Sequence, residues 1–288
     1  MQRILIASDL SERSLRALRR AIALARQFGS QLSVLHVADD DKPQALIDEE
    51  CRQATAALES LLDEVGARHL SPSPAITAAP GDPFRLIVDE AARIGADLIV
   101  MGAHRKRLLG DVFTGTTIER VMRIGRRPVL MVNRNDEARY ATVLAAVDLS
   151  DASSHALQTA RDLRLLDSTR CVVVHGFLPL AEGMMYYAGI EQARIAEHVA
   201  VSADQARAAV NAFLSDAGFA RMSDALLIEK GAPFEAIEAG IQHAQPELLV
   251  IGTHGYGGLK RMLLGSVADE VLRRVDCDVL AVPPPARP

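Results

Sequence analysis

The chain has 288 residues, a length that favours two domains, because single hydrophobic cores rarely grow beyond about 250 to 300 residues. Its 49% hydrophobic and 24% charged residues exclude a disordered chain. The net charge of −5 gives no general attraction to nucleic acid or anionic membranes, and no apolar stretch approaches the roughly 18 residues of a membrane-spanning helix. We therefore expect a cytoplasmic protein that binds neither nucleic acid nor membrane.

The first half of the chain alternates short apolar runs with amphipathic segments. In chain order we expect a strand over RILIAS, a helix from Ser11 to Phe28, a strand over QLSVLHV, a helix reaching Val65, a strand over SPAITAAP, a helix opened by Asp82 and Pro83, a strand over ADLIVMG, a helix from Thr116 to Ile124 and a strand over PVLMV. Ser11 is a suitable N-cap, and Gly29 and Gly66 are suitable residues to end helices.

The second half repeats this pattern. The segment ILIASDLSERSLRAL matches VLAAVDLSDASSHAL, which pairs Asp9 with Asp148, and VLHV matches VVHG, which pairs His36 with His175, both at an offset of 139. LIVMGAH then matches LLVIGTH at an offset of 150, so the second copy carries 11 additional residues. They fall around LPLAEGMMYYAGI, where we expect a loop or an altered helix entry near the ligand.

Strands that alternate with helices of this length predict an α/β protein of two doubly wound, Rossmann-like parallel sheets with five strands each. We place the first domain at residues 1–135 and the second at 140–288, with the boundary in the polar stretch 133–141. Ligands bind beyond the carboxyl ends of the strands in such sheets. The three cysteines lie far apart and predict neither a disulfide framework nor a metal site.

The loop GTHGYGGLKRMLLGS of the second copy is the most informative segment. Gly252 and Gly255 allow a close approach of backbone N–H groups to an anion, and Gly265 with Ser266 opens a helix whose N-terminus favours phosphate. The segment has neither the G-x-x-x-x-G-K-[ST] pattern of a P-loop nor the G-x-G-x-x-G dinucleotide pattern. A nucleotide site of another kind is therefore indicated.

The spacing G-2x-G-9x-G-[ST] resembles the signature of the universal stress protein family, and the repeat makes the chain similar to its tandem members. Asp9 with Ser11, Asp148 with Ser150, and the closing strands RPVLMV and CDVLAV support the resemblance. It implies an adenine nucleotide alpha hydrolase-like fold, in which strands 129–132 and 279–282 pair to form an internal pseudo-dimer. A homodimer of the whole chain stays open.

The resemblance also implies a ligand, ATP, with Mg or Mn bridging its phosphates, bound mainly by the second domain. In the family the aspartate contacts the adenosine, the residue after the second-strand histidine lines the adenine pocket, and the glycine loop holds ribose and phosphates. The implied binding residues of the second copy are Val147, Asp148, Gly176, Ile251, Gly252, His254, Gly255, Gly265, Ser266 and Val267. Those of the first copy are Asp9, Val37, Gly102, Arg105, Gly115 and Thr116.

The first copy departs from the signature at Arg105, which stands where Gly255 stands in the second. A non-glycine residue tolerates positive φ poorly, so we expect weaker ATP binding there. Arg105, Lys106 and Arg107 could instead pair with a phosphate chain, or form a solvated loop.

Other interpretations stay open. Capping of the following helices could be the whole role of Asp9 and Asp148. The paired histidines could recur only because the sequence is repeated, without catalytic or metal-binding roles. Tyr186 and Tyr187 could stack on a base or contact a partner. The family implies a stress-response regulator or sensor, with an unidentified protein partner and at most slow ATP hydrolysis. The alternatives are an interaction protein that needs no nucleotide and a weak ATPase or adenylate-transferring enzyme.

Overall fold

The computed structural model describes residues 1–103, 116–254 and 264–285. The first half contains β1 (Arg3–Ala7), α1 (Glu12–Phe28), β2 (Gln31–Ala38), α2 (Gln44–Glu64), the 3-10 turn η1 (Ala67–His69), β3 (Ala75–Pro80), α3 (Pro83–Arg93), β4 (Leu98–Gly102), α4 (Thr117–Ile124) and β5 (Val129–Val132). The predicted order of strands and helices is confirmed in this half.

The second half repeats the order with one additional helix. Its elements are β6 (Thr142–Ala146), α5 (Asp151–Asp162), β7 (Arg170–Phe177), α6 (Glu182–Tyr187), α7 (Gln192–Asp216), the 3-10 turn η2 (Ala220–Ala225), β8 (Leu226–Lys230), α8 (Pro233–Ala244), β9 (Leu248–Gly252), α9 (Ser266–Arg274) and β10 (Asp278–Val282).

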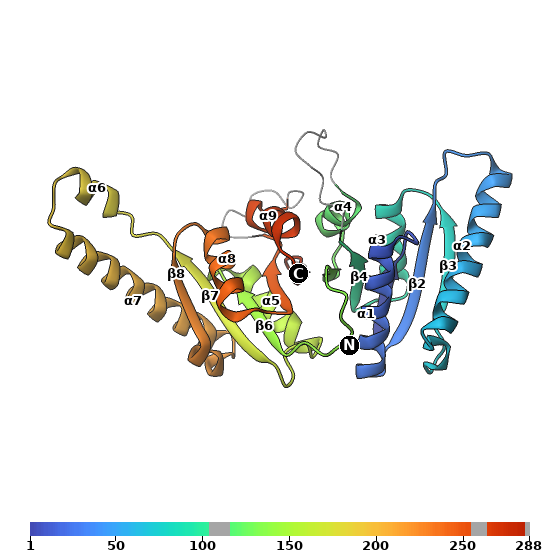
Figure 1. Cartoon of the computed structure of the whole chain (residues 1–288), viewed down its shortest axis with the longest axis horizontal. Coiled ribbons are helices and arrows are strands. Elements are labelled where there is room, and N and C mark those ends of the chain that lie inside the picture. The colour runs from blue at the N-terminus through green and yellow to red at the C-terminus, as the bar shows by residue number, and fades with distance from the viewer. Residues whose placement is uncertain (104–115, 255–263, 286–288) are drawn as a thin grey trace.

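The two half-sheets join into one sheet with the order β3-β2-β1-β4-β5-β10-β9-β6-β7-β8 (Figure 1). The strands within each half are parallel. The central pair is antiparallel, with Leu280 opposite Leu130 and Val279 opposite Met131. The predicted pairing of the last strands of the two copies is therefore confirmed, and it buries two apolar edges that would otherwise be open to other chains.

Two hydrophobic cores lie on opposite faces of this sheet. Alternate residues of β1 belong to different cores: Ile4 and Ile6 pack with α1 and α2, whereas Leu5 packs with α3 and α4. In the second half α5 and α7 continue the first core, and α8 and α9 continue the second. Since both faces are covered, the strands are apolar almost throughout, as parallel strands between helix layers require.

The helix ends follow the predicted capping chemistry. The Ser11 hydroxyl accepts the Ser14 N–H at the start of α1, and Gly29 ends this helix with a φ of 66°. Asp82 caps α3, with Pro83 at its first position. These local signals explain why the helix boundaries next to the strand ends could be read from the sequence.

The 11 additional residues of the second copy contribute to a helical arm, α6 with the amino-terminal part of α7. The arm follows the carboxyl end of β7 and projects outward at the far end of the molecule, well separated from α9 (Figure 1). It joins the sheet edge through an ion pair of 2.5 Å between Lys230 and Glu182. The arm exposes Met184 at 70% and Tyr187 at 99%, and Leu180, just before α6, is 88% exposed. The insertion is thus helical and leads away from the strand ends.

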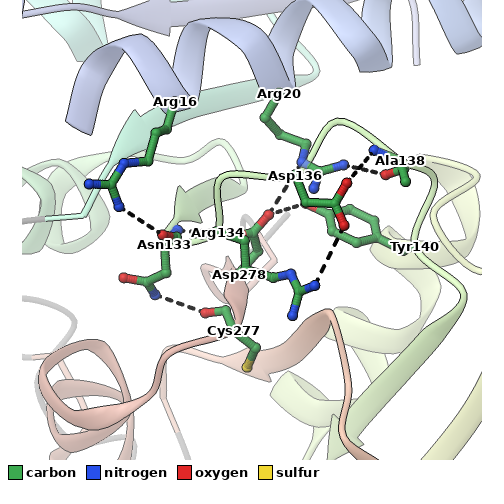
Figure 2. Close-up of polar contacts among 9 residues, drawn as sticks. All are labelled: Arg16, Arg20, Asn133, Arg134, Asp136, Ala138, Tyr140, Cys277 and Asp278. Carbon is green, nitrogen blue, oxygen red and sulfur yellow. Dashed lines mark hydrogen bonds and ion pairs between the residues drawn. The ribbon is translucent and has the colours of Figure 1, made fainter. Parts of the chain in front are cut away.

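The segment between the halves is fixed by hydrogen bonds to both of them (Figure 2). The Asn133 side chain donates to the Cys277 carbonyl at 2.8 Å, and Arg16 donates to the Asn133 carbonyl at 3.3 Å. Arg20 donates to the Ala138 carbonyl at 2.6 Å. These contacts reach from α1 through the connecting segment to the start of β10. They hold the connection in a defined path.

Candidate functional site

The turn after β1 positions Asp9 at the carboxyl end of the first half-sheet. One carboxylate oxygen, Oδ1, accepts the Ser11 N–H at 3.0 Å and the Ser11 hydroxyl at 2.5 Å. Burial raises the pKa of Asp9, but the hydrogen bonds from Ser11 outweigh it and hold that pKa below its usual value. Asp9 therefore orients the serine that caps α1.

Asp148 has the same arrangement after β6, with one further donor. Its Oδ1 accepts the Ser150 N–H at 3.1 Å, the Ser150 hydroxyl at 2.5 Å and the Ser153 hydroxyl. The Asp148 N–H donates back to the Ser153 hydroxyl at 3.0 Å. Ser150, rather than Asp148, is the N-cap of α5. The aspartate thus supports the cap and keeps its second oxygen available at the strand end.

Leu10 and Leu149, between each aspartate and its serine, have φ angles of 60° and 64°. Left-handed backbone at a residue with a Cβ costs about 1 to 2 kcal/mol, and such strain gathers at functional sites. The sequence reasoning missed this pair. The signal was the repeated D-L-S-x-x-S pattern of DLSERS and DLSDAS, which keeps the same turn in both copies.

The paired histidines of β2 and β7 bind backbone. Nδ1 of His36 lies 2.9 Å from the Ser8 carbonyl, and Nδ1 of His175 lies 2.8 Å from the Val147 carbonyl. Each ring therefore ties the second strand of its half to the end of the first strand. Within residues 1–103, 116–254 and 264–285, no three His, Cys, Asp or Glu side chains gather in a way that could hold a metal ion. His104 lies outside the described residues.

Gly102 and Gly252 end β4 and β9 where the first turns of α1 and α5 approach closely. A Cβ on Gly102 would lie 2.7 Å from the Arg13 carbonyl oxygen, and one on Gly252 would lie 3.2 Å from that of Ala152. The first glycine of each loop therefore has a packing role that the sequence reasoning did not include. Its contact with a ligand stays a prediction.

Gly176 also has a packing role. A Cβ there would lie 3.0 Å from the Ala236 Cβ and 3.4 Å from the Gly231 carbonyl oxygen, so the glycine admits the first turn of α8. Val37, its counterpart in the first half, lines a cavity. Val147 and Ile251 are 6% and 4% exposed and belong to the two cores, so their predicted ligand contacts would involve mainly backbone.

The helix that follows the loop in the second half begins without a side-chain cap. Gly265 is the N-cap of α9, and its N–H donates to the Thr253 carbonyl at 2.9 Å. Ser266 is the first helical residue and is exposed, and Val267 follows it. The N–H groups of this first turn have no acceptor within the helix. They and the Ser266 hydroxyl form a site that favours an anion.

His254 lies beside this helix end. Its Nδ1 is 2.9 Å from the Thr253 hydroxyl, and its Nε2 is buried without a hydrogen-bond partner in the described part of the chain. Burial lowers the pKa of His254, which favours the neutral ring. A buried nitrogen without a partner is costly, and a bound ligand would satisfy it.

A cavity of about 320 Å³ lies at the carboxyl end of the first half-sheet. It brings together four predicted residues of the first copy, Asp9, Val37, Gly102 and Thr116. Its volume is within the range of about 300 to 1,000 Å³ typical of small-molecule sites.

Arg105, Gly115 and Gly255 lie outside the described residues. Elsewhere, among the helices that the structure describes, none is long and apolar enough to cross a bilayer.

Comparison with known proteins agrees with the fold. The sequence matches the universal stress protein family over residues 1–133 and again over 139–283. It is 24% identical to universal stress protein E of Escherichia coli over 220 residues, which cover 70% of this chain and 65% of that protein. It is 29% identical to a universal stress protein of Methanocaldococcus jannaschii over 146 residues, which cover 46% of this chain and 82% of that one.

Some of the solved structures that it resembles cover nearly the whole chain. A universal stress protein from Archaeoglobus fulgidus superposes with a TM-score of 0.68 at 20% identity, covering 98% of both chains. At this identity the likeness shows the fold alone. The two family matches together span nearly the whole chain, one on each half of the continuous sheet. The chain belongs to the universal stress protein family, with two family domains in tandem.

Proposed function

We propose that this protein is an ATP-binding regulator or sensor of a stress response, and that its second half holds the nucleotide. The observation that carries the proposal is the amino end of α9, where Gly265 supplies no side-chain cap and Ser266 is exposed. A helix end of this kind, with N–H groups lacking acceptors, favours a phosphate group.

Two further groups support a nucleotide at this end of the sheet. The second carboxylate oxygen of Asp148 accepts no hydrogen bond from the described residues, so it can accept bonds from ribose hydroxyls. The buried Nε2 of His254 likewise has no partner in that part of the chain. Mg²⁺ or Mn²⁺ would bridge the phosphates and neutralise their charge. These two groups therefore support an adenine nucleotide at this end of the sheet, and a divalent cation bound with it stays a prediction.

Titration calorimetry of the whole chain with ATP and Mg²⁺ tests the proposal. Ser266→Asp places a carboxylate at the helix end and is expected to weaken ATP binding by about tenfold or more. Ser266→Asn also removes the hydroxyl and has the shape of aspartate without its charge, so it should weaken binding clearly less. Thr116→Asp, at the aligned position of the first half, should leave the tighter site unaffected. Equal affinities of Ser266→Asp and Ser266→Asn would contradict the assignment of the phosphate site.

The regulator reading also predicts slow turnover. No nucleophile with an adjacent base and orienting group is found among the described residues near α9, where Ser266 is exposed and His254 contacts Thr253. We expect steady-state hydrolysis far below the enzyme median of about 10 per second. A rate near that value, measured by phosphate release, would favour the ATPase alternative.

The exposed helical arm favours one second candidate, a protein-binding role that needs no nucleotide. Leu180, Met184 and Tyr187 are the kind of apolar surface that marks interaction sites. Mass spectrometry of the purified protein and the effect of ATP on its melting temperature separate the two. A co-purifying adenine nucleotide and a raised melting temperature would support the nucleotide-binding regulator. The absence of both would support the protein-binding role.

A further inference from the structure

Another cavity, of about 340 Å³, lies in the second half at the carboxyl ends of α8 and α9. Gln242 and Gln245 line it at the end of α8, and Arg274 and Val275 line it at the end of α9. Ser266 is at the opposite end of α9, so this cavity is separate from the proposed phosphate site. Its volume is in the range of small-molecule sites.

The segment between the halves contributes Arg134 to this cavity. The Arg134 N–H donates to Asp278 at 3.0 Å, which fixes the backbone of this residue (Figure 2). One terminal nitrogen of the guanidinium lies 3.5 Å from Asp136, but Nε is buried without a hydrogen-bond partner in the described part of the chain. A buried donor without an acceptor is costly, and a carboxylate bound in the cavity would supply one.

The ends of the two helices offer acceptors. The last carbonyl groups of a helix lack donors within the helix and carry the negative end of its dipole. At the end of α8 the side-chain nitrogen of Gln245 donates to the Gln242 carbonyl at 3.0 Å, which leaves the Gln245 amide oxygen as an acceptor. Asp276 adds a carboxylate to the lining. These groups favour an ammonium.

Arg274 and Glu238 also line the cavity, but they compensate each other, with 2.8 Å between guanidinium and carboxylate. The second terminal nitrogen of Arg274 pairs with Glu270 at 2.7 Å, and the guanidinium lies 4.4 Å from the centre of the Phe234 ring. The charge of Arg274 is therefore met within the protein. Arg134, with its unsatisfied Nε, is better placed to bind an anionic group of a ligand.

The rest of the lining is largely apolar. Phe234, Ile241, Pro246 and Val275 belong to it. Cys277 adds a thiol that stays neutral, because burial raises its pKa to about 12. A ligand with one anionic group, one cationic group and a short aliphatic side chain therefore matches the lining.

The internal repeat indicates that the fold itself does not require these polar groups. At the offset of 150 residues, the first copy has Val88, Ala92, Gly95, Ile124 and Arg126 in the positions of Glu238, Gln242, Gln245, Arg274 and Asp276. Gly95 and Gln245 end their helices with φ angles of 64° and 48°. A side chain is strained in this left-handed conformation, and such strain gathers at functional sites. The polar cavity is thus a property of the second half alone among the two aligned sequences.

We propose that this cavity binds a zwitterionic amino acid with an aliphatic side chain. Its carboxylate contacts Arg134, and its ammonium contacts the acceptors at the ends of α8 and α9. The inference goes beyond the proposed function and does not depend on which ligand binds at Ser266. The protein would then hold ligands of two different classes at the two ends of α9.

Titration calorimetry of the full chain with L-leucine, isocaproate and isopentylamine tests the charge requirement, because isocaproate lacks the ammonium and isopentylamine lacks the carboxylate. We expect L-leucine to bind at least about tenfold more tightly than either analogue. Arg134→Gln should weaken L-leucine binding about tenfold and leave isopentylamine binding unchanged, and Arg134→Lys should restore part of the loss. Arg93→Gln removes an exposed guanidinium of α3 and is the matched control, which should change neither.

Gln242→Trp locates the ligand, since it places a ring in the cavity from an exposed position of α8 without removing a charge. It should abolish L-leucine binding while the melting temperature stays close to that of wild type. Ser266→Asp should leave L-leucine binding unchanged, so failure of the proposed function and failure of this inference are separable. The proposal is overturned if L-leucine does not bind, if either analogue binds as tightly, or if Arg134→Gln or Gln242→Trp leaves its affinity unaltered.

Discussion

Nε of Arg20, in the first half of the chain, lies 3.4 Å from Oδ2 of Asp278, in the second half, and the two side chains are 3% and 0% exposed. Asp278 also accepts the Tyr140 hydroxyl at 2.7 Å and the backbone N–H groups of Asn133 and Arg134 at 2.9 and 3.0 Å (Figure 2). One buried carboxylate therefore joins α1, the connecting segment and the start of β10.

Removing this carboxylate should destabilise the whole chain. Asp278→Ala leaves the Arg20 guanidinium buried without its ion pair, so we expect the free energy of unfolding to fall by about 3 to 5 kcal/mol. Tyr140→Phe loses one hydrogen bond to a charged group and should cost about 1.5 to 3 kcal/mol. Urea unfolding followed by circular dichroism measures both. Asp162→Ala, whose ion pair with Arg161 is exposed, should cost less than about 1 kcal/mol.

The same carboxylate should give stability a distinctive pH dependence. Burial raises the pKa of Asp278 despite its hydrogen bonds and the charge of Arg20. An acid with a raised folded-state pKa binds more protons when folded, so its contribution to the free energy of unfolding falls as pH rises above about 4. Wild type should therefore lose stability relative to Asp278→Asn as pH increases from 4.

Asp136 provides a control of opposite sign for that pH series. The hydrogen bond from the Ala138 N–H holds the pKa of Asp136 below its usual value. Its contribution is present above about pH 4 and is lost as pH falls through the lowered pKa. Urea titrations at a series of pH values should thus show opposite slopes for Asp278→Asn and Asp136→Asn, each compared with wild type. Parallel slopes would contradict the burial argument.

The two strand-end glycines should respond unequally to alanine. A Cβ on Gly102 would meet the Arg13 carbonyl carbon and oxygen at 2.7 Å, whereas one on Gly252 has its nearest atoms at 3.2 Å. We expect Gly102→Ala to cost about 1 to 3 kcal/mol and Gly252→Ala to cost less. Gly183 in α6 has nothing within 4 Å, so Gly183→Ala should stabilise the helix slightly. Thermal melting of the three variants ranks them, and the reverse order would refute the packing account.

The left-handed turn at Leu10 should accept asparagine and reject valine. Asparagine tolerates positive φ, so Leu10→Asn should be neutral or raise the free energy of unfolding by up to about 1 kcal/mol, while β-branched Leu10→Val should lower it by at least about 1 kcal/mol. Leu46 is more exposed, at 57%, and lies in α2. Leu46→Asn should destabilise, since asparagine is a poorer helix former. The opposite signs of the two asparagine variants are the decisive result.

Local chemistry made much of this fold predictable. Ser11, Asp82 and Pro83 signal helix starts, and the repeated apolar runs fix a parallel sheet with covered faces. The pairing of β5 with β10 followed from the family resemblance. The sequence reasoning did not include the capping box of Thr116 and Glu119, although the pattern T-T-I-E is a signal for one.

Other features depend on contacts that the sequence does not reveal. Nothing local indicates that Arg20 meets Asp278, because their proximity arises only when the two copies pair. The arm was expected near the ligand, yet Tyr187 lies on a helix that leads outward, since an amphipathic segment does not specify its own direction. Arg105 of the first copy and Gly255 of the second, which occupy aligned positions, both lie outside the described residues. The effect of this difference on binding stays a prediction.

The pairing of β5 with β10 within one chain affects how the helix ends of the two halves can come to differ. In a dimer of identical chains every substitution appears twice, on both sides of the symmetry axis. Covalent linkage through residues 133–141 keeps the partner strand at an effective concentration of roughly millimolar, whatever the concentration of the protein. The halves stay paired at any expression level, and each helix end can change alone. Glu119 can close one while Gly265 leaves the other open, an asymmetry that two identical subunits could not encode.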